Sequence, residues 1–267
     1  MIALFAGRGR LPELLDRTLR AQGEAVLICA LEGQPPDGLG RTADLTYRLE
    51  TLGKLLADLS SRGVTRVCLA GALTRPQFDP ALVDAATQPL VDRLRAALPM
   101  GDDGTLRAIL CLFEEAGFEV VAATDILPAL TLPSGVPTQT QPGAAAVKDM
   151  EIGLAEIARL GEADTGQGCL VRGGNVIARE GPDGTDAMIQ DARAEGATLV
   201  KAAKPGQDRR ADLPAIGPDT ARIAAEAGLV GAIIPAGDVM VIDPAETVAA
   251  FDRAGLFLWV CANGAAP

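Results

Sequence analysis

Basic and acidic side chains gather in one short stretch of the second half of this 267-residue chain. Two of its four lysines, Lys201 and Lys204, lie there, although the sequence elsewhere strongly prefers arginine as its basic residue. A lysine ammonium is a compact charge on a rotatable stem, and cations beside carboxylates suit metal-assisted phosphoryl chemistry. We therefore expect a reactive site here, the alternative being a solvated loop with salt bridges. The other charged residues of the stretch are Asp208, Arg209, Arg210 and Asp212.

A glycine-rich loop at residues 7–12 is predicted to join the first strand to the first helix. Glycines let backbone N–H groups approach a phosphate at a helix N-terminus, so Gly9 and Leu11 are expected beside a nucleotide. Glu32 ends the second predicted strand, where a ribose-binding acid would lie. Pro12 takes the place of the third glycine of a dinucleotide-binding motif. That motif is therefore broken, and a plain tight turn is the alternative.

Two further loops are candidates for the same ligand. Residues 71–76 follow a predicted strand, and residues 101–105 precede a predicted helix. Ligands of open parallel sheets bind at the carboxyl ends of the strands, so both loops are expected near the nucleotide. The alternative for the acids is a role as helix N-caps. The candidate residues are Gly71, Ala72, Thr74, Asp102, Asp103, Gly104 and Thr105.

The first half of the chain alternates apolar strands with helices, which is typical of a parallel sheet covered on both faces. Thr51 is expected to cap one of the helices. The predicted strands are residues 2–6, 25–31, 44–49, 64–72 and 118–123, and the predicted helices are residues 11–22, 52–62, 79–98 and 103–116.

Residues 127–143 carry four prolines and no periodicity, so we predict a stiff linker at the domain boundary. One long active-site loop within a single domain is the alternative. The domains are then residues 1–132 and 144–267, with the linker at 133–143.

The second half predicts another α/β domain. Asp243 and Glu246 are expected to form a capping box. The elements are helices over 144–160, 185–195, 218–227 and 244–254, a hairpin over 168–180, and strands over 197–203, 229–235, 239–243 and 256–262.

Composition excludes several classes of protein. The chain has 24 basic and 35 acidic residues, a net charge of −11, which argues against general nucleic-acid binding. It has no histidine, so no histidine-dependent triad or metal site is available. Its five cysteines show no metal-binding spacing, and we expect most of them to be buried thiols of a cytoplasmic protein. No apolar run approaches the roughly 18 residues of a membrane span.

Five segments, taken in order, resemble one family. The sequence is similar over essentially its whole length to the UDP-2,3-diacylglucosamine pyrophosphatases of lipid A biosynthesis, in the form distinct from the calcineurin-like version. The last of the segments is long and specific. The segments are AGRGRLPELL (6–15), GDDGTLR (101–107), DTGQ (164–167), DGTDAM (183–188) and KPGQDRRADLPAIGPDT (204–220).

The resemblance implies an N-terminal Rossmann-like domain with a parallel sheet, a linker and a C-terminal α/β catalytic domain. It implies Mg²⁺- or Mn²⁺-dependent hydrolysis of UDP-2,3-diacylglucosamine at the α-phosphorus, giving UMP and 2,3-diacylglucosamine 1-phosphate (lipid X). We expect the uridine nucleotide on the first domain and the acyl chains at the domain junction. A cytoplasmic enzyme with peripheral contact to the inner membrane is expected, and a homodimer is compatible with the resemblance.

The same resemblance implies roles for individual residues. The family is expected to carry Glu-Gly-Thr-Asp where this chain has Asp183, which favours Thr185 and Asp186 as site residues over Asp183. Apart from the resemblance, we favour an ordinary helix over 218–227; the alternative is that Ala225 faces the site in place of an acidic residue, so that Ala225→Asp would raise the rate. The implied catalytic residues are Lys201, Lys204, Gln207, Asp208, Arg209 and Asp212; the implied substrate-binding residues are Asp164, Gln167 and Thr185; the implied metal ligands are Asp186, Asp208 and Asp212.

Two other functions stay open at this point. The partial glycine-rich loop and Glu32 would suit a nicotinamide-dependent oxidoreductase, although the third glycine and a typical catalytic group are missing. A non-catalytic protein that binds a nucleotide-sugar or a lipid would bind the substrate without releasing UMP.

Overall fold

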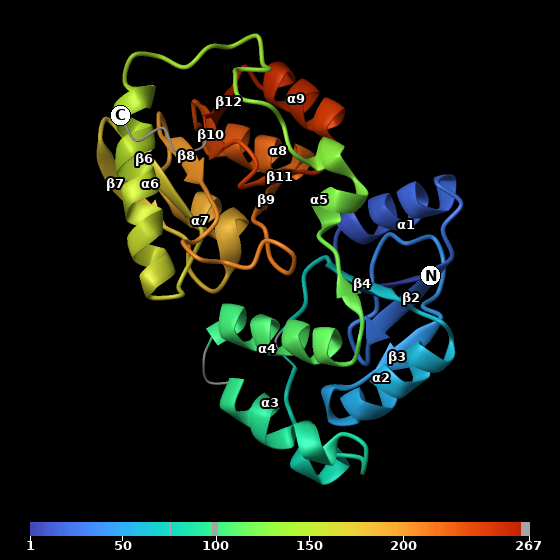
Figure 1. Cartoon of the computed structure of the whole chain (residues 1–267). Coiled ribbons are helices and arrows are strands. Elements are labelled where there is room, and N and C mark those ends of the chain that lie inside the picture. Colours follow the sequence, from blue (N-terminus) through green and yellow to red (C-terminus); the bar gives the residue numbers. More distant parts are fainter. Residues whose placement is uncertain (75, 98–100, 263–267) are drawn as a thin grey trace. The chain divides into compact units, whose positions relative to one another are not determined.

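The computed structural model describes residues 1–74, 76–97 and 101–262 (Figure 1), without the side chains of residues 94 and 101–103. The chain forms two compact units. Unit 1 contains Met1–Pro128 together with the segment Asp208–Asp212, and unit 2 contains Ala129–Gln207 and Leu213–Pro267. No helix of the described residues is long and apolar enough to span a membrane.

Unit 1 is built on a five-stranded sheet in the order β3-β2-β1-β4-β5, and every pair in it is parallel. The prediction of a parallel sheet is confirmed. The order reverses beside β1, and at such a point the loops after neighbouring strands diverge and leave room for a ligand. The strands are β1 (Ile2–Ala6), β2 (Val26–Leu31), β3 (Leu45–Tyr47), β4 (Arg66–Ala70) and β5 (Glu119–Val120).

Helices cover both faces of this sheet (Figure 1). One face carries Ala3, Phe5 and Val67, which pack in one core with α2 and α4. The helix α1 lies on the opposite face. The helices are α1 (Leu11–Ala21), α2 (Leu52–Ser61), α3 (Val91–Ala97), α4 (Gly101–Glu115) and α5 (Ala123–Ile126).

Three predictions about the helices of unit 1 need correction. The helix expected over 79–98 is helical only from Val91, after two short 3-10 turns at Pro80–Leu82 and Gln88–Leu90. Each turn contains a proline, and proline disfavours the α conformation in the residue before it. The segment 101–105 forms the first turn of α4 instead of a loop before it. Thr51 precedes α2, but its hydroxyl donates to the carbonyl of Arg48 and does not cap the helix.

Unit 2 contains a mixed five-stranded sheet in the order β12-β10-β8-β6-β7. The strands β12, β10 and β8 run parallel. The strand β6 pairs antiparallel with β8, and β7 pairs antiparallel with β6 in the predicted hairpin. The segments 229–235 and 239–243 do not pair as neighbours, because β11 pairs with β9 in a separate small sheet. The strands are β6 (Gly168–Arg172), β7 (Asn175–Arg179), β8 (Thr198–Lys201), β9 (Ala215–Ile216), β10 (Gly231–Pro235), β11 (Met240–Val241) and β12 (Phe257–Cys261).

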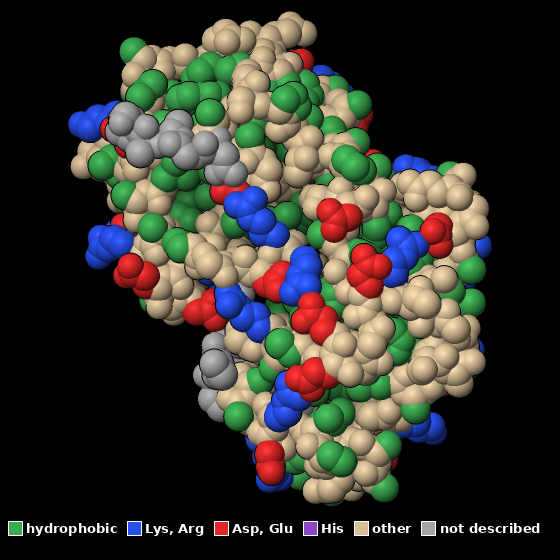
Figure 2. All heavy atoms as spheres, viewed as in Figure 1, with side chains coloured by type: hydrophobic (Ala, Val, Ile, Leu, Met, Phe, Trp, Pro, Cys, Tyr) green, Lys and Arg blue, Asp and Glu red, His purple; other side chains and the backbone are tan. Residues whose placement is uncertain are grey.

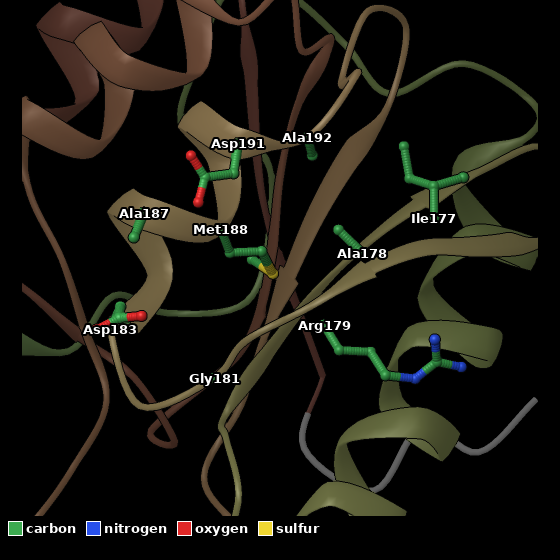
Figure 3. A pocket seen from close by; sticks show the side chains of 10 residues that line it. Ile177, Ala178, Arg179, Gly181, Asp183, Ala187, Met188, Asp191 and Ala192 are labelled. Carbon is green, nitrogen blue, oxygen red and sulfur yellow. The ribbon is translucent and has the colours of Figure 1, made fainter.

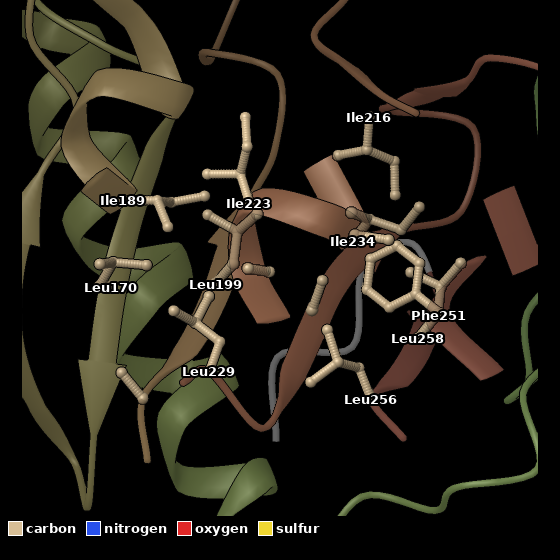
Figure 4. Packing of buried hydrophobic residues seen from close by; sticks show 14 of the residues in the cluster. Leu170, Ile189, Leu199, Ile216, Ile223, Leu229, Ile234, Phe251, Leu256 and Leu258 are labelled. Carbon is tan, nitrogen blue, oxygen red and sulfur yellow. The ribbon is translucent and has the colours of Figure 1, made fainter. Parts of the chain in front are cut away.

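Unit 2 has two buried clusters, and the larger one, shown in Figure 4, includes the ring of Phe251. Leu199, Ile234 and Leu258 from three parallel strands meet Ile223 of α8 in this core. The capping box expected before α9 is not formed, because Asp243 is left-handed, with φ 45°, and Glu246 pairs with Arg253. The helices are α6 (Ala146–Glu162), α7 (Gly184–Asp191), α8 (Pro218–Glu226) and α9 (Pro244–Arg253).

The proline-rich segment packs on unit 2. The backbone of Gly135 exchanges hydrogen bonds with Val260 at 2.9 and 2.8 Å, so the segment pairs with β12. The hydroxyl of Thr138, which is buried, accepts a hydrogen bond from the N–H of Leu258 at 2.9 Å. These contacts fix residues 135–138 against the sheet.

Candidate functional site

Lys201 ends β8 with its side chain almost fully buried. Its ammonium lies 3.4 Å from Oε1 of Glu180, the residue that follows β7, and it also donates to the hydroxyl of Thr185. The same Oε1 accepts the Thr185 hydroxyl at 2.7 Å, and Oε2 accepts the N–H of Gln167 at 3.0 Å. One carboxylate therefore holds a buried cation, a hydroxyl and a backbone amide in fixed positions.

Lys204 forms a second ion pair three residues further on. Its ammonium contacts the carboxylate of Asp164, and its side chain is only 10% exposed. Its backbone N–H donates to Oε1 of Gln207 at 2.9 Å. Asp164 has φ 50°, a left-handed conformation that non-glycine residues adopt at a cost and that is common at functional sites.

These residues form what we call the lysine cluster, at the carboxyl ends of β7 and β8. Two lysines face two carboxylates, and Glu180 also holds a hydroxyl and a backbone amide beside them. Six of its seven members are predicted site residues that the structure brings together in unit 2. The members are Asp164, Gln167, Glu180, Thr185, Lys201, Lys204 and Gln207.

Glu180 is the member that sequence reasoning missed. The local signal is an acid directly after an alternating strand, between a hairpin and a glycine–proline turn. The glycines opposite it supply a second signal. A Cβ on Gly166 would lie 2.5 Å from the carbonyl oxygen of Glu180, and one on Gly168 would lie 2.9 Å from its Oε2. Both glycines are needed because the Glu180 backbone and carboxylate approach this closely.

Asp183 and Asp186 lie on α7, next to the lysine cluster in sequence. Asp183 lines a separate open hollow of about 380 Å³ (Figure 3). Arg179 also lines it, but its guanidinium turns away from Asp183 and pairs with Glu156 of α6 at 2.5 Å. Asp186 is exposed on the first turn of α7. On α8, Ala225 is exposed and Glu226 pairs with Arg222 at 2.9 Å.

The predicted residues Asp208, Arg209 and Asp212 belong to unit 1. Asp208 accepts hydrogen bonds from the guanidinium of Arg210 at 2.8 and 3.0 Å, and this pairing lowers the pKa of the carboxyl. Arg210 also contacts Glu114 of α4 at 2.5 Å. Basic side chains elsewhere are likewise interspersed with acidic ones on the face shown in Figure 2.

The predicted metal ligands are divided between the two units. Asp186 belongs to unit 2, whereas Asp208 and Asp212 belong to unit 1, and the carboxylate of Asp208 is engaged by Arg210. Within the described ranges, no three acidic or cysteine side chains come close enough to hold an ion.

Three backbone donors of the glycine-rich loop of unit 1 are occupied. The N–H of Gly7 donates to Ala70 at 2.8 Å, that of Arg8 to Ala72 at 2.8 Å, and that of Gly9 to the carboxylate of Asp37 at 2.5 Å. In this conformation the loop is a closed turn. Leu11 is buried at the start of α1.

Glu32, the candidate ribose acid, pairs with Arg48 at 3.2 Å.

A cavity of about 350 Å³ opens at the carboxyl ends of the unit 1 strands. It brings together the predicted residues Gly71, Ala72, Thr74 and Thr105, with Asp212 beside them. Most of the lining is aliphatic or aromatic, from β1 to β4, α2 and α4, and we call it the apolar cavity. Gly104 lies half-buried on α4, and the predicted side chains of Asp102 and Asp103 lie outside the described part.

Fold and site together define a two-domain α/β protein with a buried lysine–carboxylate cluster in its second sheet. Two family models match: the LpxI N-terminal domain over residues 1–130 and the LpxI C-terminal domain over residues 133–259. The chain belongs to the LpxI family, which confirms the resemblance in its sequence. It is 35% identical over 268 residues, 96% of each chain, to UDP-2,3-diacylglucosamine pyrophosphatase LpxI of Caulobacter vibrioides.

Proposed function

We propose that this protein hydrolyses UDP-2,3-diacylglucosamine in lipid A biosynthesis, releasing UMP and 2,3-diacylglucosamine 1-phosphate. The relative with that substrate in its name matches over 96% of the chain. The observation that carries the proposal is the lysine cluster, because a diphosphate needs preorganised cations and hydrogen-bond donors. Water adds to the α-phosphorus, and the oxygen that bridges the two phosphates leaves with the acylated sugar phosphate.

The two lysines have different tasks in this proposal. Lys201 is held by Glu180 and Thr185 and stays in place. Lys204 pairs with the more exposed Asp164, whose side chain is 28% exposed against 10% for the lysine. A diphosphate oxygen replaces that carboxylate as the partner of Lys204. The ammonium then stabilises the charge that develops as the bridging bond breaks.

The proposal also includes a divalent metal ion at the diphosphate and contact with the membrane. Mg²⁺ is commonly bound by one or two carboxylates together with substrate phosphates and waters, so it does not need three protein acids. We propose that Mg²⁺ or Mn²⁺ supplies further charge to the diphosphate. We also propose that the protein meets its diacylated substrate at the inner membrane surface.

Phosphorus NMR of the purified protein with UDP-2,3-diacylglucosamine and Mg²⁺ tests the reaction. The signals of UMP and of the acylated sugar 1-phosphate should replace that of the diphosphate. Binding without turnover would instead indicate a non-catalytic protein, and NADH binding with enhanced fluorescence would indicate an oxidoreductase. Full activity after exhaustive EDTA treatment would contradict the metal requirement.

Lys204→Ala tests the assigned site. We expect kcat to fall about 100-fold or more, with a smaller rise in KM, because one electrostatic contact to the transition state is lost. Lys148→Ala is the matched control, since Lys148 is exposed on α6 outside the lysine cluster, and it should keep full activity. If kcat of the Lys204→Ala variant stayed within about threefold of the parent value, Lys204 would have only a structural role.

A further inference from the structure

We infer that the apolar cavity of unit 1 holds one acyl chain of the substrate. The inference rests on the proposed function, which supplies a ligand with two such chains. Beyond that function, one acyl chain is assigned to unit 1, and the residues that limit the length of this chain are identified.

The inner wall of the apolar cavity is aromatic and rigid. Phe5 and Phe113 form the inner wall with ring centroids 4.9 Å apart, and Tyr47 packs edge-on to Phe5 at 5.2 Å. Phe5 and Phe113 are also members of the unit 1 core, only 6% and 1% exposed. A wall fixed in a close-packed core does not yield, so it limits how deep a chain can reach.

Some apolar side chains that line the cavity are left partly exposed inside the fold of unit 1. Leu69, the last residue but one of β4, is only half-buried, although its neighbours Cys68 and Ala70 are buried. Tyr47 and Ile109 are likewise half-buried while packed on the core. All three line the cavity. A methylene buried against such surface strengthens binding by about fourfold.

The polar groups of the lining favour a lipid over the nucleotide as the ligand of the cavity. A uracil or ribose buried here would need free polar partners. The Thr105 hydroxyl already donates to Ala97 at 3.2 Å. The hydroxyl of Thr74 accepts Arg8 at 3.1 Å, and its N–H and C=O bond the side chain of Gln34 at 2.6 and 2.7 Å. An acyl chain needs no hydrogen bond from these groups, so their existing hydrogen bonds stay intact.

The negative charge in the lining favours an acyl chain that is attached to a sugar over a free fatty acid. Asp212 is the acidic residue in the described lining. A free fatty acid would bring a second carboxylate toward it, which like charges disfavour. A chain linked to a sugar as an ester or amide is neutral at that end.

The test fills the cavity from α4. Ile109→Trp should lower kcat/KM at least tenfold for a substrate with long acyl chains, and leave a short-chain analogue such as the diacetyl form within about twofold. Leu106→Trp, from the same helix, provides a second filling variant if the first does not fold. Cys111→Trp is the matched control, because Cys111 is exposed on α4 and absent from the lining.

Binding without turnover distinguishes this inference from the proposed function. Calorimetry with 2,3-diacylglucosamine 1-phosphate and with UMP is run on the same variants. The inference expects weaker lipid binding and unchanged UMP binding in Ile109→Trp, even if no hydrolysis is found in the parent. Weaker UMP binding would place the nucleotide in the cavity, and unchanged lipid binding would leave the cavity without a role; either result overturns the inference.

Discussion

A single carboxylate organises the candidate site at the scale of residues. Glu180 binds the ammonium of Lys201, the hydroxyl of Thr185 and the N–H of Gln167 at once. Its side chain is 11% exposed and that of Lys201 is 8% exposed. A buried ion pair is not strongly stabilising in itself, but a buried charge that loses its partner is costly.

We therefore expect Glu180→Ala to lower the free energy of unfolding by about 3–5 kcal/mol, as measured by urea denaturation. Glu246→Ala is the control, because the Glu246–Arg253 pair is 52% and 64% exposed, and exposed pairs contribute about 0–1 kcal/mol. Equal losses in the two variants would show that the Lys201 ammonium does not depend on Glu180.

Close backbone approach at the element scale locks the loop after β1 to the loop after β4. Arg8 and Ala72 exchange backbone hydrogen bonds at 2.8 and 3.0 Å. Gly71 makes the approach possible, because it has φ +87° and a Cβ there would lie 2.6 Å from the carbonyl oxygen of Arg8. The apolar cavity opens next to this junction, so the same glycine also shapes its rim.

Gly71→Ala should therefore cost more stability than the same change at Gly117. Gly117 has a similar φ, +91°, but an added Cβ there meets nothing within 4 Å. Its change should cost only the conformational penalty of about 1–2 kcal/mol, while Gly71→Ala adds a steric cost of about 1–3 kcal/mol. Thermal unfolding of the two variants makes the comparison, and equal losses would mean that the loops separate freely.

Thiol burial is a property of the whole molecule, because both units contribute buried cysteines. Cys29 and Cys68 lie in the unit 1 sheet, and Cys169 and Cys261 lie in the unit 2 sheet. Burial raises the pKa of Cys29, Cys68 and Cys169 to about 12, and it raises the pKa of Cys261 as well. These thiols are neutral near pH 8, and the thiolate is the reactive form.

A thiol reagent such as DTNB should consequently label one cysteine quickly in the native protein at pH 8, the exposed Cys111. All five should react in urea. Cys111→Ser should abolish the fast phase. A remaining fast phase in that variant would show that one of the two sheets opens locally.

Local sequence signals predict the alternation of buried strands and helices, the hairpin of β6 and β7, and six of the seven residues of the lysine cluster. Periodicity and turn residues are local signals, and they specify elements such as α8 between Pro218 and Gly228 with little help from tertiary contacts. The long motif that begins at Lys204 identified the family, because its order of residues is specific.

Tertiary structure alone decided which side chains meet. Glu180 joins Lys201 because the antiparallel β6 lies between β7 and β8, and this sheet order cannot be read from the spacing of residues 180 and 201. The sequence predicts a phosphate site at the glycine-rich loop, and the tertiary structure supplies acceptors for three of its N–H groups in Ala70, Ala72 and Asp37. A local pattern shows which groups can bind; the packing of distant segments decides which remain free to do so.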